Sequence, residues 1–278
     1  MREQNMQEKE TALLNLLARL GSAAVAFSGG VDSALLAALA REALKDRAVA
    51  VTLRSPLLPL QEQEDAARVA EQIGIRHVVL DIDDLADGDF AANDAQRCYY
   101  CKRARLRFLA AWARENGVAA VLEGSNADDL GDYRPGMRAL AESGAAQSPF
   151  LQCSVTKAEI RALAKKRSLP VWDKPSAACL ASRIAYGLAI TPERLRQVEE
   201  AERILRARCR GQLRVRHHGD LARIEAEPAE AARLAQPETA ARVEAALKAL
   251  GFTFVALDLG GYRTGSANEA LSIADKER

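Results

Sequence analysis

The sequence predicts an α/β protein: a doubly wound parallel sheet followed by a smaller C-terminal α+β domain. Over the first two-thirds of the chain, short apolar runs alternate with amphipathic helical stretches, which is typical of parallel strands covered on both faces. Aromatic residues make up only 5% of the chain, and alanine and leucine are abundant, which favours helices over an all-β sandwich. After residue 183 the pattern changes to paired strand-like runs between helices.

Four strands are predicted for the parallel sheet, each a short apolar run separated from the next by a helical pattern. They are expected at Ala24–Phe27, Ala48–Leu53, Arg76–Leu80 and Val118–Glu123. The intervening helices are expected at Ser33–Lys45, 60–73 and 101–115. A further helix is predicted after Thr156, because Thr156 and Glu159 form a capping-box pattern in which each side chain can bond the other's backbone N–H.

The smaller domain is predicted to combine helices with a short sheet. Thr191 followed by Pro192 is a strong helix start, and the helical pattern continues to about residue 208. Two strand-like runs then flank His218-Gly219-Asp220, which suits a hairpin turn. The hairpin strands are predicted at 213–217 and 221–227, a helix at 229–249 and a last strand at 252–259. The two domains are predicted to comprise residues 1–186 and 187–278.

Composition and charge exclude several classes of protein. Lysine and arginine number 39 and aspartate and glutamate 38, a net charge of +1 that argues against nucleic acid as a partner. The first residues are polar and lack the apolar core of a signal peptide. No apolar run approaches the length that spans a bilayer, so we expect a cytoplasmic protein without membrane contact.

The strongest functional pattern is SGGVDS at residues 28–33, between the first predicted strand and the first predicted helix. Two adjacent glycines let the backbone turn tightly and come close to a ligand. Backbone N–H groups, serine hydroxyls and the positive end of the helix would then face an anion. Because phosphates bind at this place in doubly wound sheets, the pattern predicts a phosphate site rather than a plain connecting turn.

SGGVDS resembles the PP-loop of the ATP pyrophosphatases, within the adenine-nucleotide alpha-hydrolase-like superfamily. This resemblance implies that ATP is cleaved between its α and β phosphates and that AMP passes to a substrate oxygen. It also makes Asp32 a catalytic residue and a candidate Mg²⁺ ligand beside pyrophosphate. The chain has no GxxxxGK[ST] loop, which disfavours γ-phosphoryl transfer.

Two other segments are expected to complete the nucleotide site. EGSNADDLGDYRPG at 123–136 follows a predicted strand and resembles the nucleotide-binding turn of the superfamily. The second strand ends near Thr52 and Leu53, where an adenine would contact backbone. The predicted ATP-binding residues are Ser28, Gly29, Gly30, Val31, Asp32, Ser33, Thr52, Leu53, Gly124 and Asp128.

Further motifs narrow the resemblance to the LarE family, the ATP-dependent sulfur transferases of nickel-pincer cofactor synthesis. Together with the 123–136 segment they cover nearly the whole chain: RCYYCK at 97–102, WDKPSAACLASR at 172–183, LRVRHHGDLARIE at 213–225 and GYRTGS at 261–266. The resemblance implies that a pyridinium dicarboxylate mononucleotide is adenylated, that a cysteine thiolate forms a thioester, and that Cβ–S cleavage leaves a thiocarboxylate and dehydroalanine. One branch of the family is thought to use a three-cysteine iron–sulfur cluster instead, which we do not favour here.

The chain has five cysteines, an odd number without a leader, which argues against a disulfide scaffold. Cys179 matches the sulfur donor of the family, and its small neighbours leave room for an acyl-adenylate. Arg183 and Lys174 are close enough in sequence to lower the pKa of that thiol. Cys98 and Cys101 could be half of a zinc site, a redox pair, part of a cluster, or two cysteines that stand at a helix start without a chemical role. We expect Cys153 and Cys209 to pack.

The substrate phosphate is expected to bind in the smaller domain. Arg214 and Arg216 alternate along a predicted strand, so both side chains lie on one face, and they match the phosphate-binding arginines of the family. Glu202 and Glu225 lie in segments that the family also uses around this site. The family resemblance further implies a homo-oligomer, specifically a hexamer.

Two other functions stay open at this point. A PP-loop tRNA thiolase would relay a persulfide through Cys101 and Cys179, although the near-neutral charge and missing RNA-binding domain argue against it. A module of the same fold that senses AMP without catalysis is the third hypothesis. It would not need the intact SGGVDS loop, which suits a protein that holds pyrophosphate.

Overall fold

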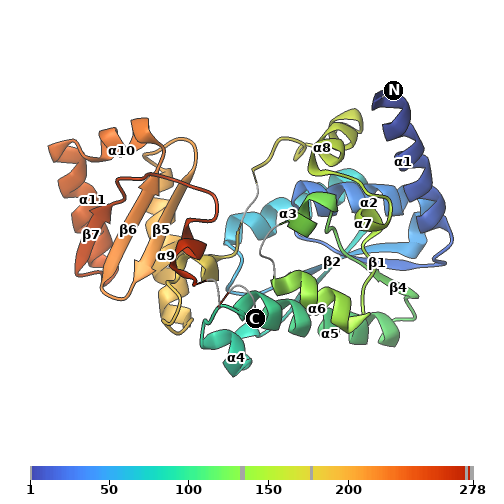
Figure 1. Ribbon diagram of the computed structural model, residues 1–278, viewed down its shortest axis with the longest axis horizontal. Coiled ribbons are helices and arrows are strands. Elements are labelled where there is room, and N and C mark those ends of the chain that lie inside the picture. Colours follow the sequence, from blue (N-terminus) through green and yellow to red (C-terminus); the bar gives the residue numbers. More distant parts are fainter. Residues whose placement is uncertain (1, 132–134, 176–177, 273–274, 276–278) are drawn as a thin grey trace. The chain divides into compact units, whose positions relative to one another are not determined.

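The computed structural model describes residues 2–131, 135–175, 178–272 and 275 (Figure 1). The chain forms two compact units, one made of 1–83 and 98–177 and the other of 84–97 and 178–278. The first unit thus ends before residue 186, and the second unit also includes the segment 84–97. The domain boundary at residue 186 stays a prediction. In the part of the chain that the structure describes, no helix has the length and apolar character that a membrane span requires.

The first unit is built on a four-stranded parallel sheet, as predicted. Its strands are β1 Ala23–Ala26, β2 Ala48–Arg54, β3 Arg76–Asp81 and β4 Ala120–Leu122, in the order β3-β2-β1-β4. The strand order reverses between β1 and β4, which are neighbours although β2 and β3 lie between them in sequence. In doubly wound sheets ligands bind beyond the carboxyl ends of the strands at such a reversal.

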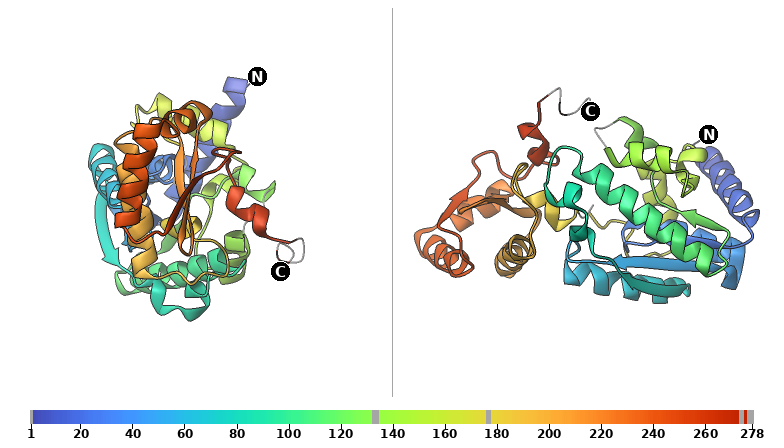
Figure 2. Two further views of the ribbon diagram at one scale, coloured as in Figure 1. Left: turned by 90° about the vertical axis from the view of Figure 1, so that its left-hand side faces the viewer. Right: turned by 90° about the horizontal axis from the view of Figure 1, so that it is seen from below.

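Helices cover both faces of this sheet (Figure 1). The face with α2 and α3 carries the larger core, to which Leu13 and Leu17 of α1 contribute, whereas Leu109 and Ala113 of α5 pack on the opposite face. Figure 2 shows the long α5 running beside the strands. The helix α1 was not predicted. The helices of this unit are α1 Arg2–Ala18, α2 Val31–Leu44, α3 Leu60–Ile73, α5 Arg97–Glu115, α6 Pro135–Ser143, α7 Pro149–Gln152 and α8 Lys157–Lys166, and of these α5 begins one residue before the unit.

The second unit is a small α+β fold, which was also predicted. The hairpin of β5 Leu213–His218 and β6 Leu221–Ala226 is antiparallel, and β7 Phe254–Leu257 joins β6 in parallel. Figure 2 shows α9 and α11 on the same face of this sheet, where Leu213 and Val215 enter the core. The helices are α4 Gly88–Ala91, α9 Pro192–Arg206, α10 Pro228–Leu234 and α11 Pro237–Ala249.

Two predicted elements of this unit differ from the observed ones. The helix predicted over 229–249 is two helices, because Pro237 has no N–H to continue α10 and instead occupies the first position of α11. The strand predicted over 252–259 is limited to 254–257, the length over which β6 offers partners at Leu221–Ile224.

Candidate functional site

The loop after β1 is shaped by the close approach of a helix. Gly29 has φ +73°, in the left-handed region, and a Cβ there would lie 2.7 Å from the backbone Cα of Ala66 in α3. Any side chain at position 29 would therefore meet both backbone strain and collision with a helix. This explains why the first glycine of SGGVDS is needed.

The start of α2 leaves its first N–H groups to a ligand. Gly30 is the N-cap residue and supplies no side-chain acceptor to the helix. The Ser33 hydroxyl instead accepts from the N–H of Ser28, at 3.2 Å, and donates to the carbonyl of Gly30, at 3.1 Å. Ser28 itself is exposed, whereas Val31 and Ser33 are buried. A helix N-terminus prepared in this way binds anions through its N–H groups and its dipole.

Asp32, in the first turn of α2, is held by a cation and an amide. The Lys157 ammonium forms an ion pair with its carboxylate, and the Asn126 side chain donates to it at 3.4 Å. The backbone N–H of Lys157 also donates to the Asp128 carboxylate, at 2.7 Å, so one residue at the start of α8 joins two predicted site residues. Asp128 is exposed. Lys157 was not among the predicted site residues, and Asn126 was predicted only as part of the nucleotide-binding turn.

The loop after β4 packs directly on the start of α2. A Cβ at Gly124 would lie 3.1 Å from the Asp32 Cβ, so the predicted Gly124 brings the two loops together. Glu123 beside it is buried and accepts from the Lys102 ammonium at 2.6 Å and from the hydroxyls of Ser125 and Ser148. Burial alone would raise the pKa of Glu123, but Lys102 and these hydrogen bonds outweigh it and lower that pKa.

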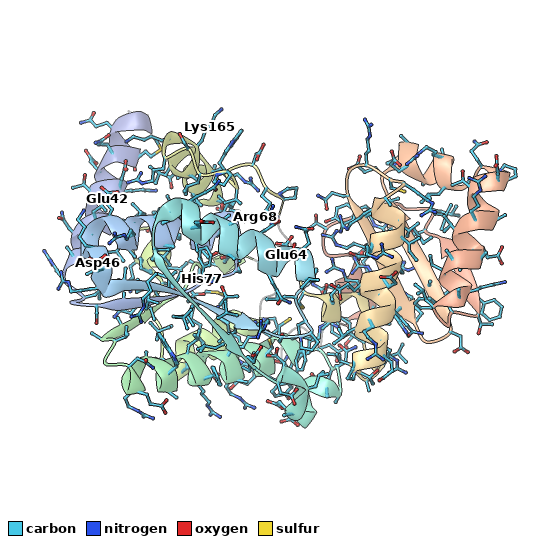
Figure 3. All side chains as sticks on the ribbon, turned by 180° about the vertical axis from the view of Figure 1, so that it is seen from behind. Glu42, Asp46, Glu64, Arg68, His77 and Lys165 are labelled. Carbon is cyan, nitrogen blue, oxygen red and sulfur yellow. The ribbon has the colours of Figure 1, made fainter. Side chains whose placement is uncertain are left out.

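The end of β2 contributes backbone rather than side chain. The Thr52 hydroxyl donates to the carbonyl of Phe27 at 2.8 Å, so His77 Nε2, also 2.8 Å away, must be the donor to that hydroxyl. His77 lies on β3 and is labelled in Figure 3. The N–H of Phe27 donates to the carbonyl of Val51, so the backbone groups of Val51 face β1. Residues two apart on a strand direct their N–H and C=O to the same side, so those of Leu53 also face the β1 side of β2, beyond the last residue of β1. This is where an adenine edge was predicted to meet backbone.

In the second unit, Cys179 precedes a short 3-10 turn, η4 Leu180–Arg183. The thiol-bearing residue is half-buried and Ala178 is exposed, while Ala177, another predicted small neighbour, lies outside the described residues. The Arg183 guanidinium donates to the carbonyls of Ala178 and Cys179 and is paired with Glu202. In the first unit, Lys174 pairs with two carboxylates, those of Glu62 and Asp65.

The two arginines predicted to bind phosphate are both buried on β5, but only Arg216 forms an ion pair with a carboxylate among the described residues. Arg216 forms an ion pair with Glu225 at 2.8 Å and also donates to the hydroxyl of Ser266. Arg214 donates to a backbone carbonyl and lies over the Tyr262 ring, 5.3 Å from its centroid, and in the described chain no ion pair joins it to a carboxylate. Burial, followed by repulsion from Arg183, lowers the pKa of Arg214.

The two glutamates of the predicted site are buried partners of arginines. Glu225 is fully buried between Arg216 and Arg223, and Glu202 accepts from Arg183 and from the backbone N–H of Val215. Their negative charges thus hold guanidinium groups in place. A direct contact of either carboxylate with a ligand stays a prediction.

The other cysteines fall into two groups. Cys98 and Cys101 lie three residues apart near the start of α5, exposed and half-exposed respectively, and so share one helix face. Burial raises the pKa of the Cys153 and Cys209 thiols, which favours their neutral forms and a packing role. Within the described ranges, no three His, Cys, Asp or Glu side chains gather as a metal site would need.

The parallel sheet carries a glycine-rich loop at residues 28–33, where the strand order reverses, and the helix that follows leaves N–H groups for an anion. These features define the nucleotide-binding unit of a PP-loop protein. The NAD synthase family model matches residues 7–183 of this chain. An uncharacterized protein of Synechocystis is 39% identical over 96% of this chain and 99% of its own length. The tRNA-specific 2-thiouridylase MnmA of Parvibaculum lavamentivorans is 34% identical over 54% of this chain and 47% of its own.

One relative of nearly the same extent carries a functional name. The pyridinium-3,5-bisthiocarboxylic acid mononucleotide synthase of Lactiplantibacillus plantarum is 37% identical over 267 residues, 96% of each chain. The protein described here therefore belongs to the LarE family of NAD synthase-like PP-loop proteins.

Proposed function

We propose that this chain is an ATP-dependent sulfur transferase of nickel-pincer cofactor synthesis. It adenylates a carboxylate of a pyridinium dicarboxylate mononucleotide and converts it to a thiocarboxylate with the sulfur of Cys179. The observation that carries the proposal is the 37% identity, over 96% of both chains, to a pyridinium-3,5-bisthiocarboxylic acid mononucleotide synthase. A relative that shared only the parallel-sheet unit would not also match the second unit, as this synthase does.

The loop geometry supports the first half of the reaction. The uncapped start of α2 would bind the phosphates of ATP, and the backbone at Leu53 would receive the adenine edge. Mg²⁺ in nucleotide sites uses one or two carboxylates besides phosphate oxygens and water, which fits Asp32 as a single protein ligand. Lys157 would then exchange its ion pair with Asp32 for one with a phosphate.

The second half uses the thiolate of Cys179. It attacks the acyl-adenylate carbonyl, releases AMP and forms a thioester. A base then removes the Cα proton of Cys179, the Cβ–Sγ bond breaks, and the sulfur leaves on the substrate. The residue becomes dehydroalanine, so each chain acts once. Arg214 is buried near the charge of Glu202 but forms no direct ion pair with a carboxylate among the described residues, so its guanidinium is well suited to the phosphate of the mononucleotide.

A tRNA thiolase is the second candidate, because the Parvibaculum 2-thiouridylase is 34% identical in the matched region. That match spans only 54% of this chain, and the net charge of +1 offers little to an RNA backbone. The two candidates differ in acceptor. Pyrophosphate release that requires tRNA, and not the mononucleotide, would replace our proposal by this one.

The test follows pyrophosphate release and sulfur transfer with purified protein, ATP, Mg²⁺ and the carboxylated pyridinium mononucleotide. Cys179→Ala should release pyrophosphate but transfer no sulfur, whereas Asp32→Asn should do neither and keep its circular dichroism spectrum. Cys153→Ala is the matched control and should keep both activities, because that thiol packs in the core. Undiminished sulfur transfer by Cys179→Ala would contradict the assignment of the donor.

A further inference from the structure

The backbone carbonyl of Cys179 is surrounded by hydrogen-bond donors. It accepts from the N–H of Ser182 at 3.0 Å, from the hydroxyl of Ser182 at 2.7 Å, and from the Arg183 guanidinium at 2.9 Å. A 3-10 turn that starts at this residue needs only the first of these bonds. The other two, one of them from a cation, are more than the turn requires.

The proton positions in this cluster are defined by its chemistry. The Arg183 guanidinium can only donate, so the Ser182 hydroxyl accepts from it at 3.0 Å and must use its single hydrogen for the Cys179 carbonyl. Both side chains therefore direct positive charge density toward one carbonyl oxygen.

Other contacts hold this arrangement rigid. Arg183 is 3% exposed, and Glu202, 4% exposed, accepts from its Nε at 2.9 Å. Glu202 is itself bound by the backbone N–H of Val215, and the carbonyl of Ser182 accepts from Arg216 at 3.0 Å. Donors that are already oriented need no reorganisation when charge develops on the oxygen that they face.

We propose that Ser182 and Arg183 stabilise the negative charge that develops on the Cys179 carbonyl oxygen when its Cα proton is removed. The inference rests on the proposed sulfur-donor function and assigns these two residues to its elimination step. A base takes the Cα proton, and the electron pair passes into the Cys179 carbonyl as an enolate. The pair then returns to form the Cα–Cβ double bond as sulfur leaves with the substrate thiocarboxylate, and no oxidant or reductant is consumed.

The first test separates elimination from the steps before it. In single-turnover reactions, intact mass distinguishes free protein, the Cys179 thioester adduct and the dehydroalanine product. Ser182→Ala should form the adduct at a rate within about twofold of wild type but resolve it about 100- to 1,000-fold more slowly, as expected for loss of one oxyanion donor. Ser143→Ala, whose hydroxyl bonds the Leu140 carbonyl, is the matched control and should resolve the adduct at the wild-type rate.

The second test needs neither ATP nor substrate. In a background that carries Cys98→Ser, Cys101→Ser, Cys153→Ser and Cys209→Ser, only the thiol of Cys179 remains. There 2,5-dibromohexanediamide alkylates Cys179 twice to a cyclic sulfonium, which then leaves by the same Cα–H and Cβ–S cleavages. Ser182→Ala and Arg183→Lys should slow the conversion of sulfonium to dehydroalanine and leave the rate of alkylation unchanged. A loss of local structure would change the alkylation rate as well.

The outcomes distinguish this inference from the proposed function. Adduct formation with wild-type elimination rates in Ser182→Ala and Arg183→Lys would overturn the role of these donors and leave the proposed function standing. Absence of both the adduct and the dehydroalanine product in the wild-type protein would overturn the proposed function. Slower sulfonium elimination in both variants would still support the inferred effect on the Cys179 Cα proton.

Discussion

Acidification from pH 7 to pH 5 should destabilise the protein through its histidines, whose pKa values folding lowers, and the largest of these contributions should come from His217. His217, on β5, is 3% exposed, and its ring lies 5.1 Å from the ring of Phe252. Its Nδ1 accepts from the N–H of Gly219, so Nε2 carries the proton and donates to the Gln197 side chain at 2.9 Å. Burial, followed by the positive charge of Arg194, lowers the pKa of His217 to about 4 from 6.5.

The size and sign of the effect follow from linkage. The unfolded chain binds a proton near pH 6.5 and the folded chain only near pH 4, so stability is fully present above pH 6.5 and is lost as the pH falls. Between pH 7 and pH 5 the free energy of unfolding should drop by about 2 kcal/mol from His217 alone. Below the folded pKa the loss levels off at about 3 kcal/mol.

Urea unfolding at pH 7 and pH 5 measures this drop directly. His217→Gln should be less stable at pH 7 but should lose about 2 kcal/mol less than wild type on acidification. His218→Gln should change the dependence on pH less than His217→Gln does, because His218 is exposed, although partial burial and then the charge of Arg223 lower its pKa as well. An equal loss of stability in wild type and His217→Gln would refute the assignment of a buried neutral imidazole.

Two further predictions concern the binding loops. Gly29→Ala should abolish ATP binding in isothermal titration calorimetry, because the added Cβ collides with Ala66. The control is Gly74→Ala, at φ +69° with open space around it, which should bind ATP normally. Equal binding by both variants would refute the effect of the collision. Arg214→Ala should weaken mononucleotide binding about 10- to 100-fold, the equivalent of one charge-assisted hydrogen bond, and leave ATP binding unchanged. Arg242→Ala, at an exposed position, is the control, and equal weakening of both ligands would make Arg214 a structural residue.

The fold could be predicted because its signals are local. Each strand of the parallel sheet contains a short apolar run, and the capping box at Thr156 and Glu159 forms with both of its hydrogen bonds. The helix α1 was missed because its first residues are polar and only leucines such as Leu13 and Leu17 mark its buried side. The break at Pro237 follows from local chemistry and was open to prediction.

The site was less predictable because its contacts join distant parts of the sequence. Lys157 lies 125 positions from Asp32, and no local pattern announces their ion pair. The capping box did place Lys157 at a helix start, which was the available signal. Arg183 was expected to act on the Cys179 thiol, but its guanidinium instead contacts the carbonyl of that residue and pairs with Glu202, because only the fold brings α9 to the 3-10 turn.

If the sulfur comes from the side chain of Cys179, the mass of the intact protein must record its loss. After incubation with ATP, Mg²⁺ and the mononucleotide, without added sulfide or iron, we expect one turnover per chain and a mass loss equal to hydrogen sulfide, mapped to residue 179. Several turnovers with Cys179 unchanged, or an iron–sulfur absorbance that correlates with activity, would contradict this expectation.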